Sequence, residues 1–549
     1  MIQIQLQGRK QEVKEATRIC DLAMQYDGGN LLCGAFVDNV DRSLLYKLYD
    51  GCDVRFFDLK TDAGRRIYEN TNIFVFARAF KTLFPDQEPI MRYSLGGGIY
   101  CEFNDGTPMT EMHVRALKDA MQDLIKKDVR IRQYKYGKEK IRELCDRGQC
   151  NMNLALLEQA DCENVTVYEL DGYFAFFFSK LLMHTAQIYV TNLIPYDKGC
   201  VLLGVDYKKL TRVKEFEEQR NLHEELRNYE KWCEDLGVYQ IADLNNSVKD
   251  SSIVKMITVA EAHHERLIGR IADTIYEQRE TKRIVLISGP SSAGKTTTSK
   301  RLRTHLNAMG LHPVSIELDN YFVDREKTPR GKDGKYDFEC LEAVDVELFN
   351  KNLIQLMQTG SAKIPSFDFK SGRRREQFTE ITVDENSPII IEGIHGLNEK
   401  LTVHIPKEQK FKIYVNDLTH INFDDLNRIP TSDIRLIRRI VRDNMNRGHD
   451  AVKTIEMWDS VREGEIKNIF PYSNVADVVF NTSLFYELSA LKKYAEPLLK
   501  QITQQQPCYY EARRLLNILR YFEELHDEEA IYSSSILREF IGGNVFERL

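Results

Sequence analysis

The sequence lacks paired cysteines, and this excludes several classes of site. Its 11 cysteines are scattered singly, no CxxC motif occurs, and the closest two are Cys145 and Cys150. A zinc ribbon or a thioredoxin-type redox site needs closely spaced cysteines, so neither is expected. Unpaired cysteines in a long chain are typical of reduced thiols, which predicts a cytoplasmic protein.

The sequence also lacks a long apolar run. The most apolar stretch, residues 173–183, contains Ser179 and Lys180 and is too short to cross a bilayer, which takes about 20 apolar residues. The first residues, MIQIQLQGRKQEV, alternate like a strand and hold no apolar h-region, so no signal peptide is expected. We therefore expect no contact with a membrane.

There is no excess of positive charge and no internal repeat. Lys and Arg number 76 against 83 Asp and Glu, a formal net charge of −7. This excludes a globally basic nucleic-acid binder but leaves room for a local basic patch. Hydrophobic residues make up 42% of the chain, which is enough for packed cores. At roughly 150 residues per domain, the 549 residues predict three or four domains.

Changes of pattern divide the chain into five parts. These are a small mixed α/β module over residues 1–60, an α+β region over 61–205, a charged helical connector over 206–280, an α/β domain over 281–500 and a helical extension over 501–549. In the second part, the apolar spacing predicts a helix over 72–83, closed by Pro85. In the fourth, the apolar runs RIVLIS, VSIEL, PIIIEG and FKIYV alternate with helical segments. This pattern is typical of a parallel sheet covered by helices on both faces.

The sharpest motif is a phosphate-binding loop. Residues 289–296, GPSSAGKT, match GxxxxGK[ST] between an apolar strand and a helix, which is the context that this motif requires. Glycines let the backbone amides turn toward phosphate oxygens, and the helix adds its positive end. Lys295 can reach the β and γ phosphates, and Thr296 offers a hydroxyl to Mg²⁺. The motif predicts ATP and Mg²⁺ binding by Gly289, Pro290, Ser291, Ser292, Ala293, Gly294, Lys295, Thr296 and Thr297.

Two carboxylates follow two later strands. Asp319 comes after VSIEL and Glu392 ends PIIIEG. Because an open parallel sheet places its chemistry at the carboxyl ends of its strands, both are expected beside the loop. There they would bind Mg²⁺ and orient an acceptor hydroxyl. A solvated loop acid or a helix cap is the alternative for each one taken alone.

An arginine-rich helix follows at residues 433–447. Spacings of three and four put Arg435, Arg438, Arg439 and Arg442 along one face. One interpretation is a lid that carries arginines to the phosphates, and the other is a solvated basic helix. The P-loop upstream favours the lid.

This series of motifs resembles the uridine kinase family and the related phosphoribulokinases. The matching stretches, in the order of the family, are GPSSAGKTT, LDNYF, YDFECLEAVD, PSFDFKSGRRR, IIIEGIHGL, DIRLIRRIVRD and YSNVADVVFN. The resemblance implies an ATP-dependent kinase that transfers the γ-phosphoryl group to the 5′-hydroxyl of a nucleoside. It also implies roles for individual residues.

In that resemblance Lys295, Asp319 and Arg438 would be catalytic, with Asp319 as the base on the acceptor side. Thr296, Asp319 and Glu392 would surround Mg²⁺. The implied acceptor contacts are Asp319, Tyr321, Asp337 (to the sugar hydroxyls), Phe367 and Arg435, and the implied ATP phosphate contacts are Arg438 and Arg442.

Two departures leave the acceptor open. Where the family has a Tyr and a His that contact the pyrimidine, this chain has Phe367 and Gly372, and FDHP is altered to YDFE at 336–339. A site without its hydrogen-bond partners loses discrimination between bases. A kinase of another sugar-like metabolite therefore remains an alternative. A third hypothesis is an RNA-associated regulator that uses the P-loop as a switch, although a switch needs no acceptor base such as Asp319.

The N-terminal half resembles a different family. Residues 1–60 resemble a TGS module, and 61–205 resemble the second N-terminal, editing domain of threonyl-tRNA synthetases, through ENTNIFVFARAFKTLFP and YSLGGGIYCEF. At the positions of that family's four zinc ligands stand Asn70, Phe74, Phe177 and Leu181. None of these side chains is a zinc donor. We therefore expect no zinc and no hydrolysis of aminoacyl-tRNA.

A basic segment at residues 126–142, with Tyr134 and Tyr136 among its cations, could contact RNA. A solvated charged surface is the favoured reading, and a regulatory or assembly role in an oligomer is a further alternative. Because the P-loop, base and lid all lie downstream, we expect residues 281–549 to retain phosphotransfer alone, with Asn245 as a safer starting point.

Overall fold

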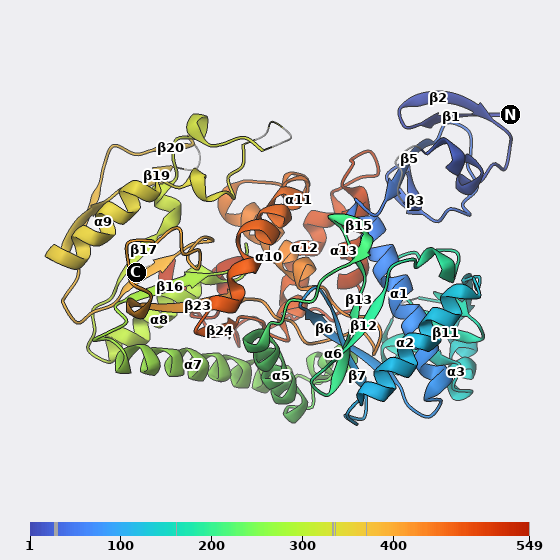
Figure 1. Ribbon diagram of the computed structural model, residues 1–549, viewed down its shortest axis with the longest axis horizontal. Helices are drawn as coiled ribbons and strands as arrows, with labels where there is room; N and C mark the ends of the chain where they lie inside the picture. The colour runs from blue at the N-terminus through green and yellow to red at the C-terminus, as the bar shows by residue number, and fades with distance from the viewer. Residues whose placement is uncertain (27–30, 161, 332–333, 335, 369–370, 548–549) are drawn as a thin grey trace.

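The computed structural model describes residues 1–549 except 27–30, 161, 332–333, 335, 369–370 and 548–549. The N-terminal half and the C-terminal α/β part lie side by side along the long axis of the molecule (Figure 1). The orange and red helices α12 and α13 lie near the middle of the molecule, between the two halves (Figure 1). No helix in the described residues is long and apolar enough to cross a bilayer.

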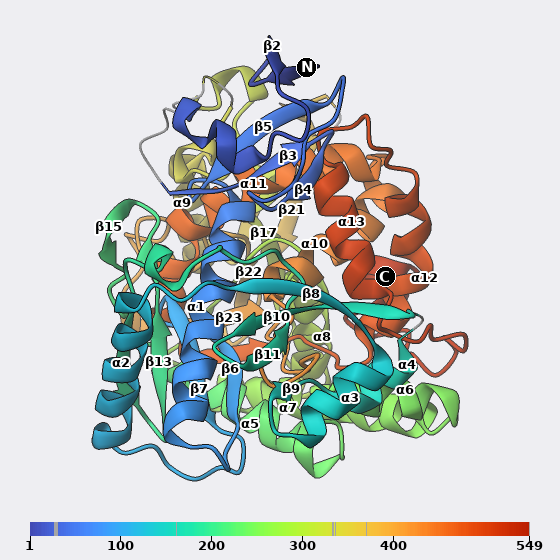
Figure 2. The same ribbon diagram turned by 90° about the vertical axis from the view of Figure 1, so that its right-hand side faces the viewer.

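The first sheet occupies the N-terminal module. It has five strands in the order β2-β1-β5-β3-β4, with β1 and β5 parallel and the other pairs antiparallel. The strands are β1 (Ile2–Leu6), β2 (Arg9–Val13), β3 (Leu32–Val37), β4 (Val40–Arg42) and β5 (Asp53–Asp58). The module packs against α13 (Tyr509–Leu519), where the Phe36 and Tyr510 rings lie 5.2 Å apart. Figure 2 shows β3 and β4 of the module next to α13.

The next region carries two four-stranded sheets and a long helix. Their orders are β8-β10-β11-β9 and β12-β13-β7-β6. The elements are α1 (Asp62–Leu83), β6 (Pro89–Leu95), β7 (Gly98–Phe103), α2 (Glu111–Lys126), β8 (Arg132–Gly137), α3 (Lys138–Asp146), β9 (Cys150–Asn151), α4 (Leu154–Gln159), β10 (Asn164–Leu170), β11 (Tyr173–Phe176), β12 (Asn192–Tyr196) and β13 (Gly199–Leu203). A small hairpin follows, formed by β14 (Val205–Asp206) and β15 (Lys209–Val213).

Helix α1 begins ten residues before the predicted start at 72. The Thr61 hydroxyl caps it by accepting a hydrogen bond from the Gly64 amide at 3.1 Å. Its first turns, although polar in sequence, bury Ile67 and Tyr68. The helix ends at Leu83, as predicted, because Pro85 cannot continue it.

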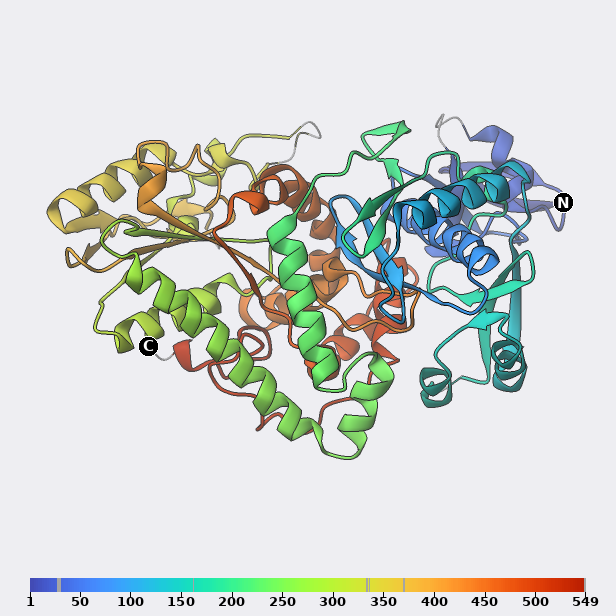
Figure 3. The ribbon, with the colours of Figure 1, turned by 60° about the horizontal axis from the view of Figure 1, so that its bottom comes forward.

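Three helices form the predicted connector: α5 (Arg220–Asp235), α6 (Ile241–Lys249) and α7 (Ile253–Glu277). In Figure 3 they appear as green helices between and beneath the two halves. They are not a solvated spacer, because α5 and α7 both contact strand β24 of the C-terminal sheet and α7 packs along α8. His264, one of the adjacent histidines of α7, is buried and contacts the Ser483 carbonyl oxygen at 3.1 Å.

The C-terminal sheet has five parallel strands in the order β17-β22-β16-β23-β24. They are β16 (Ile284–Ser288), β17 (Val314–Glu317), β22 (Ile389–Glu392), β23 (Lys410–Asn416) and β24 (Val478–Asn481). In β16, Val285 and Ile287 belong to one hydrophobic core while Ile284 and Leu286 belong to another. Both faces of the sheet are therefore covered, as the sequence predicts.

The helices of this part and its small hairpins complete the fold. They are α8 (Lys295–Ala308), α9 (Val346–Thr359), α10 (Thr431–Arg442), α11 (Ala451–Asn468), α12 (Glu487–Lys500), α14 (Arg538–Ile541), and the paired strands β18 (Ser361–Ile364) with β21 (Thr379–Thr382) and β19 (Phe367–Asp368) with β20 (Arg373–Arg374). The C-terminal segment contributes Leu515, Ile536 and Phe540 to the same core as Val285 and Ile287.

Candidate active site

The loop between β16 and α8 has the backbone that a phosphate cradle requires. Gly294 has a φ of 82° and Ser292 a φ of 59°, so the chain turns sharply before α8 begins at Lys295. A Cβ at Gly289 would lie 1.9 Å from the Val415 carbonyl oxygen, so only glycine fits there. The Ser292 hydroxyl oxygen is buried and has no hydrogen-bond partner among the residues that the structure describes. The predicted loop is thus held at the carboxyl end of the sheet, with one unsatisfied polar group inside it.

The strand-end carboxylates meet this loop. Parallel pairing sets Glu392 opposite Ile287 and Glu317, so the ends of three strands coincide. The Thr296 hydroxyl donates to Glu392 Oε1 at 2.8 Å. Lys295 Nζ donates to the Pro290 carbonyl oxygen of the loop at 3.0 Å. The structure therefore brings together the P-loop and the carboxylate that the sequence placed at the end of PIIIEG.

The electrostatics of these groups are coupled. Burial raises the pKa of Glu392 to about 8, although Lys295 opposes the shift. Burial also raises the pKa of Asp319, against the opposing effect of Lys295, Arg447 and Arg442. The pKa of Lys295 is lowered, first by burial. The raised pKa of Asp319 lies closer to neutral pH than that of an ordinary carboxylate, which suits a group that accepts a proton.

Helix α10 packs directly on the P-loop. Arg435 Nη1 donates to the Ser291 carbonyl oxygen at 3.0 Å and Arg438 Nη1 donates to the Ser292 carbonyl oxygen at 3.3 Å. Arg439 Nη1 donates to the Ser291 hydroxyl at 2.7 Å. All three arginines are buried, at 6% exposure or less. The solvated-helix alternative is therefore wrong.

Two of the predicted phosphate and acceptor arginines are, however, held by carboxylates. Arg435 forms a two-point contact with Glu465, which also accepts from the Ser291 amide at 3.0 Å. Arg438 Nε donates to Glu487 Oε2 at 2.5 Å and lies 3.6 Å from Asp417. Both guanidinium groups thus contact loop carbonyl oxygens, whereas the implied roles put Arg435 at the nucleoside and Arg438 at the phosphates.

The cations that face Asp319 come from the end of the same segment. Arg442, predicted as a phosphate contact, pairs with Asp443 at 2.8 Å, and Arg447 lies 3.7 Å from the same carboxylate. Both oppose the rise in the pKa of Asp319. Arg447 ends the predicted basic run at 433–447, but the face predicted from the spacing of the arginines did not include it.

Comparison with known proteins identifies the family. The model of the phosphoribulokinase / uridine kinase family matches residues 284–485. A uridine kinase of Clostridium tetani is 31% identical over 36% of this chain and 87% of its own length. The chain belongs to the phosphoribulokinase / uridine kinase family.

Other relatives match a similar share of this family member. A uridine kinase of Saccharomyces cerevisiae is 28% identical over 36% of both chains. The structure of a possible uridine kinase from Bacillus stearothermophilus aligns with 37% of this chain and 89% of its own, at 21% identity and a TM-score of 0.23. As a member of the family, the chain is a nucleotide-binding phosphotransferase with an alcohol acceptor.

The acceptor side of this kinase differs from the implied arrangement. Tyr321 is fully buried, and its hydroxyl accepts from Asn352 Nδ2 at 3.1 Å. In this structure Tyr321 packs in the core with its hydroxyl directed into the protein, and its predicted contact with the acceptor stays a prediction. Asp337 is partly exposed; its Oδ1 accepts from the Glu339 amide at 3.1 Å.

The two altered positions of the family pattern lie near each other. The Phe367 amide donates to Asn320 Oδ1 at 3.4 Å, next to Asp319 in the chain, and its ring lies 5.8 Å from Phe322. Gly372 has a φ of 70°, and a Cβ there would lie 2.7 Å from the Arg325 guanidinium. A histidine at 372 would therefore need both a strained backbone and a displaced arginine.

An apolar cluster stands where the N-terminal resemblance puts zinc ligands. The Phe74 ring on α1 and the Phe177 ring lie 5.4 Å apart, and both are buried. Asn70 Nδ2 donates to the Ser179 hydroxyl at 2.7 Å. In the described part of the chain, no group of three or more His, Cys, Asp or Glu side chains could hold a metal ion. The absence of zinc and of tRNA hydrolysis remains a prediction.

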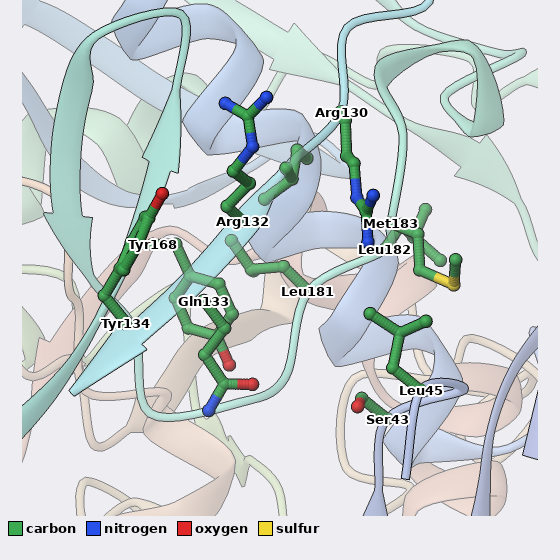
Figure 4. Close-up of a pocket in the computed structure, with 11 residues that line it drawn as sticks. Ser43, Leu45, Arg130, Arg132, Gln133, Tyr134, Tyr168, Leu181, Leu182 and Met183 are labelled. Atoms are coloured by element: carbon green, nitrogen blue, oxygen red, sulfur yellow. The ribbon is translucent and has the colours of Figure 1, made fainter. Parts of the chain in front are cut away.

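The basic segment borders a cavity of about 350 Å³ (Figure 4). Its lining combines Arg130 and Arg132 with apolar side chains, Leu181 among them, and Ser43 and Leu45 of the N-terminal module. Arg132 pairs with Glu169 at 3.0 Å. The Tyr134 and Tyr136 rings stack on each other at 5.3 Å and lie against Phe174. RNA contact by residues 126–142 stays a prediction.

Proposed function

We propose that this protein transfers the γ-phosphoryl group of ATP to the 5′-hydroxyl of a nucleoside. The observation that carries the proposal is the hydrogen bond between Thr296 and Glu392, with Lys295 and Asp319 in electrostatic contact beside it. The relatives named uridine kinase support the nucleoside.

The oxygen donors at this point suit Mg²⁺. Thr296 and Glu392 would hold the ion together with Asp319, and one or two carboxylates plus phosphate oxygens are its usual ligands in kinases. When bound, the ion neutralises charge on the phosphate oxygens. The remaining roles belong to the chain itself.

Those roles follow from position. The loop amides and Lys295 bind and orient the phosphates, and the Lys295 ammonium stabilises the negative charge of the transferring group. Asp319 positions the acceptor hydroxyl and takes up its proton as the new O–P bond forms and the bond to the leaving phosphate breaks. Arg442, facing Asp319, would offset charge at the transfer point.

Phe367 and Gly372 do not specify which nucleobase the acceptor carries. Neither side chain can donate a hydrogen bond to a pyrimidine, so we expect weak discrimination among bases. A kinase of another sugar-like metabolite is the second candidate, and the same residues favour it. Asp319 does not support the hypothesis of an RNA-associated regulator, because a nucleotide switch uses no acceptor-side catalytic base.

A screen with the full chain tests the proposal. Nucleosides and sugar phosphates are incubated with ATP and Mg²⁺, and ADP release and acceptor phosphorylation are followed together. We expect at least one nucleoside to be phosphorylated. Phosphorylation confined to sugar phosphates would favour the second candidate, and ADP release without any phosphorylated acceptor would contradict both.

Lys295→Ala links that activity to the P-loop. Losing an ammonium that stabilises transferring charge costs about 10²–10³ in rate. Lys300→Ala, five residues later on α8, is the matched control and should retain activity. An unchanged kcat and KM for ATP in Lys295→Ala would mean that this loop is not the active site.

A further inference from the structure

The C-terminal segment of the chain lies against the P-loop. A Cβ at Gly294 would come within 2.7 Å of Ile536 Cγ2, and the Phe540 ring lies 5.1 Å from the Arg438 guanidinium. Asn544 Nδ2 donates to the Thr297 hydroxyl at 3.4 Å. These side chains are 0–5% exposed. A segment about 240 residues away in the chain thus forms a wall of the phosphate site.

Glu539, in this wall, places a carboxylate where a P-loop would bind a phosphate group. Glu539 Oε2 accepts from the Thr297 amide at 3.2 Å and from the Thr297 hydroxyl at 2.7 Å. Thr297 lies in the first turn of α8, directly after the GKT of the loop, where amides and the helix dipole favour negative charge. In P-loops the backbone amides of this region cradle the α and β phosphates. The carboxylate therefore uses a donor that a bound triphosphate needs.

Glu539 also faces the cations of the site. The pKa of Lys295 is lowered by burial, and Glu539 is among the carboxylates that oppose the shift. Burial acts to lower the pKa of Arg438, but the neighbouring carboxylates outweigh it and raise the pKa, Asp417 and Glu487 more strongly than Glu539. A triphosphate arriving at the loop would meet cations already partly neutralised by this side chain.

The segment as a whole is too deeply packed to leave when ATP binds. Five of its side chains are buried in the core that contains Val285 and Ile287 of the sheet: Ile531, Ile536, Leu537, Phe540 and Ile541. Exposing five such side chains would cost more free energy than nucleotide binding ordinarily provides. The Glu539 side chain, in contrast, is only partly buried, so its carboxylate can rotate away while the backbone stays in place.

We propose that Glu539 is a built-in anionic competitor at the P-loop and that it sets the affinity of the enzyme for ATP. The inference rests on the proposed function only in taking ATP as the donor. A triphosphate has to displace the carboxylate from Thr297, and the like charge weakens its binding. The contact of Glu539 with Thr297 acts on ATP binding, which can be measured without any acceptor.

An alternative role for Glu539 would be in binding the ribose, and its removal would then have the opposite effect on ATP affinity. If Glu539 accepted hydrogen bonds from the ribose hydroxyls of ATP, its removal would weaken binding. It would also have no influence on a ligand without a ribose. These two differences make the roles separable by one set of measurements.

The test compares Glu539→Gln with Glu529→Gln in the full chain. Glutamine keeps an oxygen that can accept from the Thr297 amide and removes only the charge, whereas Glu529 is exposed ten residues earlier. The Kd values of ATP and of inorganic triphosphate are measured by calorimetry without acceptor, at fixed Mg²⁺. We expect Glu539→Gln to bind both ligands about tenfold more tightly, as expected when a like-charge contact is removed. Glu529→Gln should match the wild type.

Equal or weaker binding of both ligands by Glu539→Gln would overturn the proposal, and weaker binding of ATP alone would assign Glu539 to the ribose. Glu539→Ala, checked for an unchanged melting temperature, should also bind more tightly. Because no acceptor is present, the result is independent of which nucleoside is phosphorylated. Absence of ATP binding by every variant would contradict both the proposed function and this inference.

Discussion

The carboxylate of Asp319 interacts electrostatically with the P-loop lysine, with Arg442 at the end of α10 and with Arg447. The transition state of phosphoryl transfer is loose, so the carboxylate is needed to position the hydroxyl and to accept its proton. Asp319→Asn keeps the shape and removes the charge. We expect kcat to fall by about 10²-fold or more while the Kd of ATP stays within a few-fold.

Asp273→Asn, on the exposed face of α7, is the control for that substitution. Activity is compared over a range of Mg²⁺ concentrations, since Asp319 is also a proposed metal ligand. Full recovery of Asp319→Asn in excess Mg²⁺ would assign the residue to the metal and remove its role as a base.

For single residues, the sequence predicts positions that follow from local motifs or from the general geometry of parallel sheets. The loop at 289–296 and the carboxylate at the end of β22 follow from local order and from the rule that strand ends meet. Tyr321, Arg438 and Glu539 depend on elements far apart in sequence. Tyr321 follows Asp319 by two residues, yet it turns into the core toward Asn352. No local pattern indicates that Glu539 reaches Thr297.

Among the elements, α5 shows how a charged helix can belong to a core. Its sequence predicts a connector, and its exposed face is charged, but Leu226 and Cys233 are buried and the Tyr229 hydroxyl donates to the Ser483 carbonyl oxygen at 3.1 Å. The apolar periodicity of the sequence predicts that α5 is a helix, as it does for α10. The surface against which the helix packs depends on tertiary structure.

Glu225 on α5 provides a pH test of that packing. Burial alone raises its pKa to about 7, compared with about 4.3 in an unfolded chain. Between these values the folded state holds more protons than the unfolded state, so stability is present at low pH and is lost as pH rises through 7. We expect Glu225→Gln to be more stable than the wild type at pH 8.5, by up to about 3 kcal/mol, and to differ little at pH 4.5.

Thermal unfolding at several pH values checks this expectation. Glu224→Gln is the matched control, because Glu224 is exposed and pairs with Arg220 at 3.1 Å on the helix surface. A Glu225→Gln profile parallel to that of the wild type would mean that the carboxyl is solvated and that α5 is not held against the sheet as described.

In the whole molecule the two halves share their cores. Tyr93 and Val201 of the N-terminal half pack in one cluster with Ile284 of the C-terminal sheet. The Phe178 and Phe423 rings lie 4.3 Å apart, and Asn427 Nδ2 donates to the Phe176 carbonyl oxygen at 2.9 Å. Composition and motifs locate the parts of a chain, but they carry no information on how much surface the parts bury against each other.

This sharing changes the expectation for an isolated kinase part. A start at Asn245 falls inside α6, where the Asn245 side chain donates to the Tyr521 carbonyl oxygen at 2.7 Å. It also removes α5 and exposes the surface of β24 that α5 covers. A fragment of residues 206–549 keeps all three connector helices together with every P-loop contact described above.

We therefore expect residues 206–549 to bind ATP and to transfer phosphate with a kcat within about tenfold of the full chain, since the groups that act in transfer are all retained. The fragment 245–549 loses the buried side chains of α5, worth about 1.5–3 kcal/mol each. At a few degrees per kcal/mol, its Tm should lie roughly 10 °C or more below that of 206–549. Calorimetric melting and ADP release on both fragments check this. Equal melting temperatures would show that α5 is a spacer, as the sequence predicts, and an inactive but folded 206–549 would show that the N-terminal half contributes to the active site.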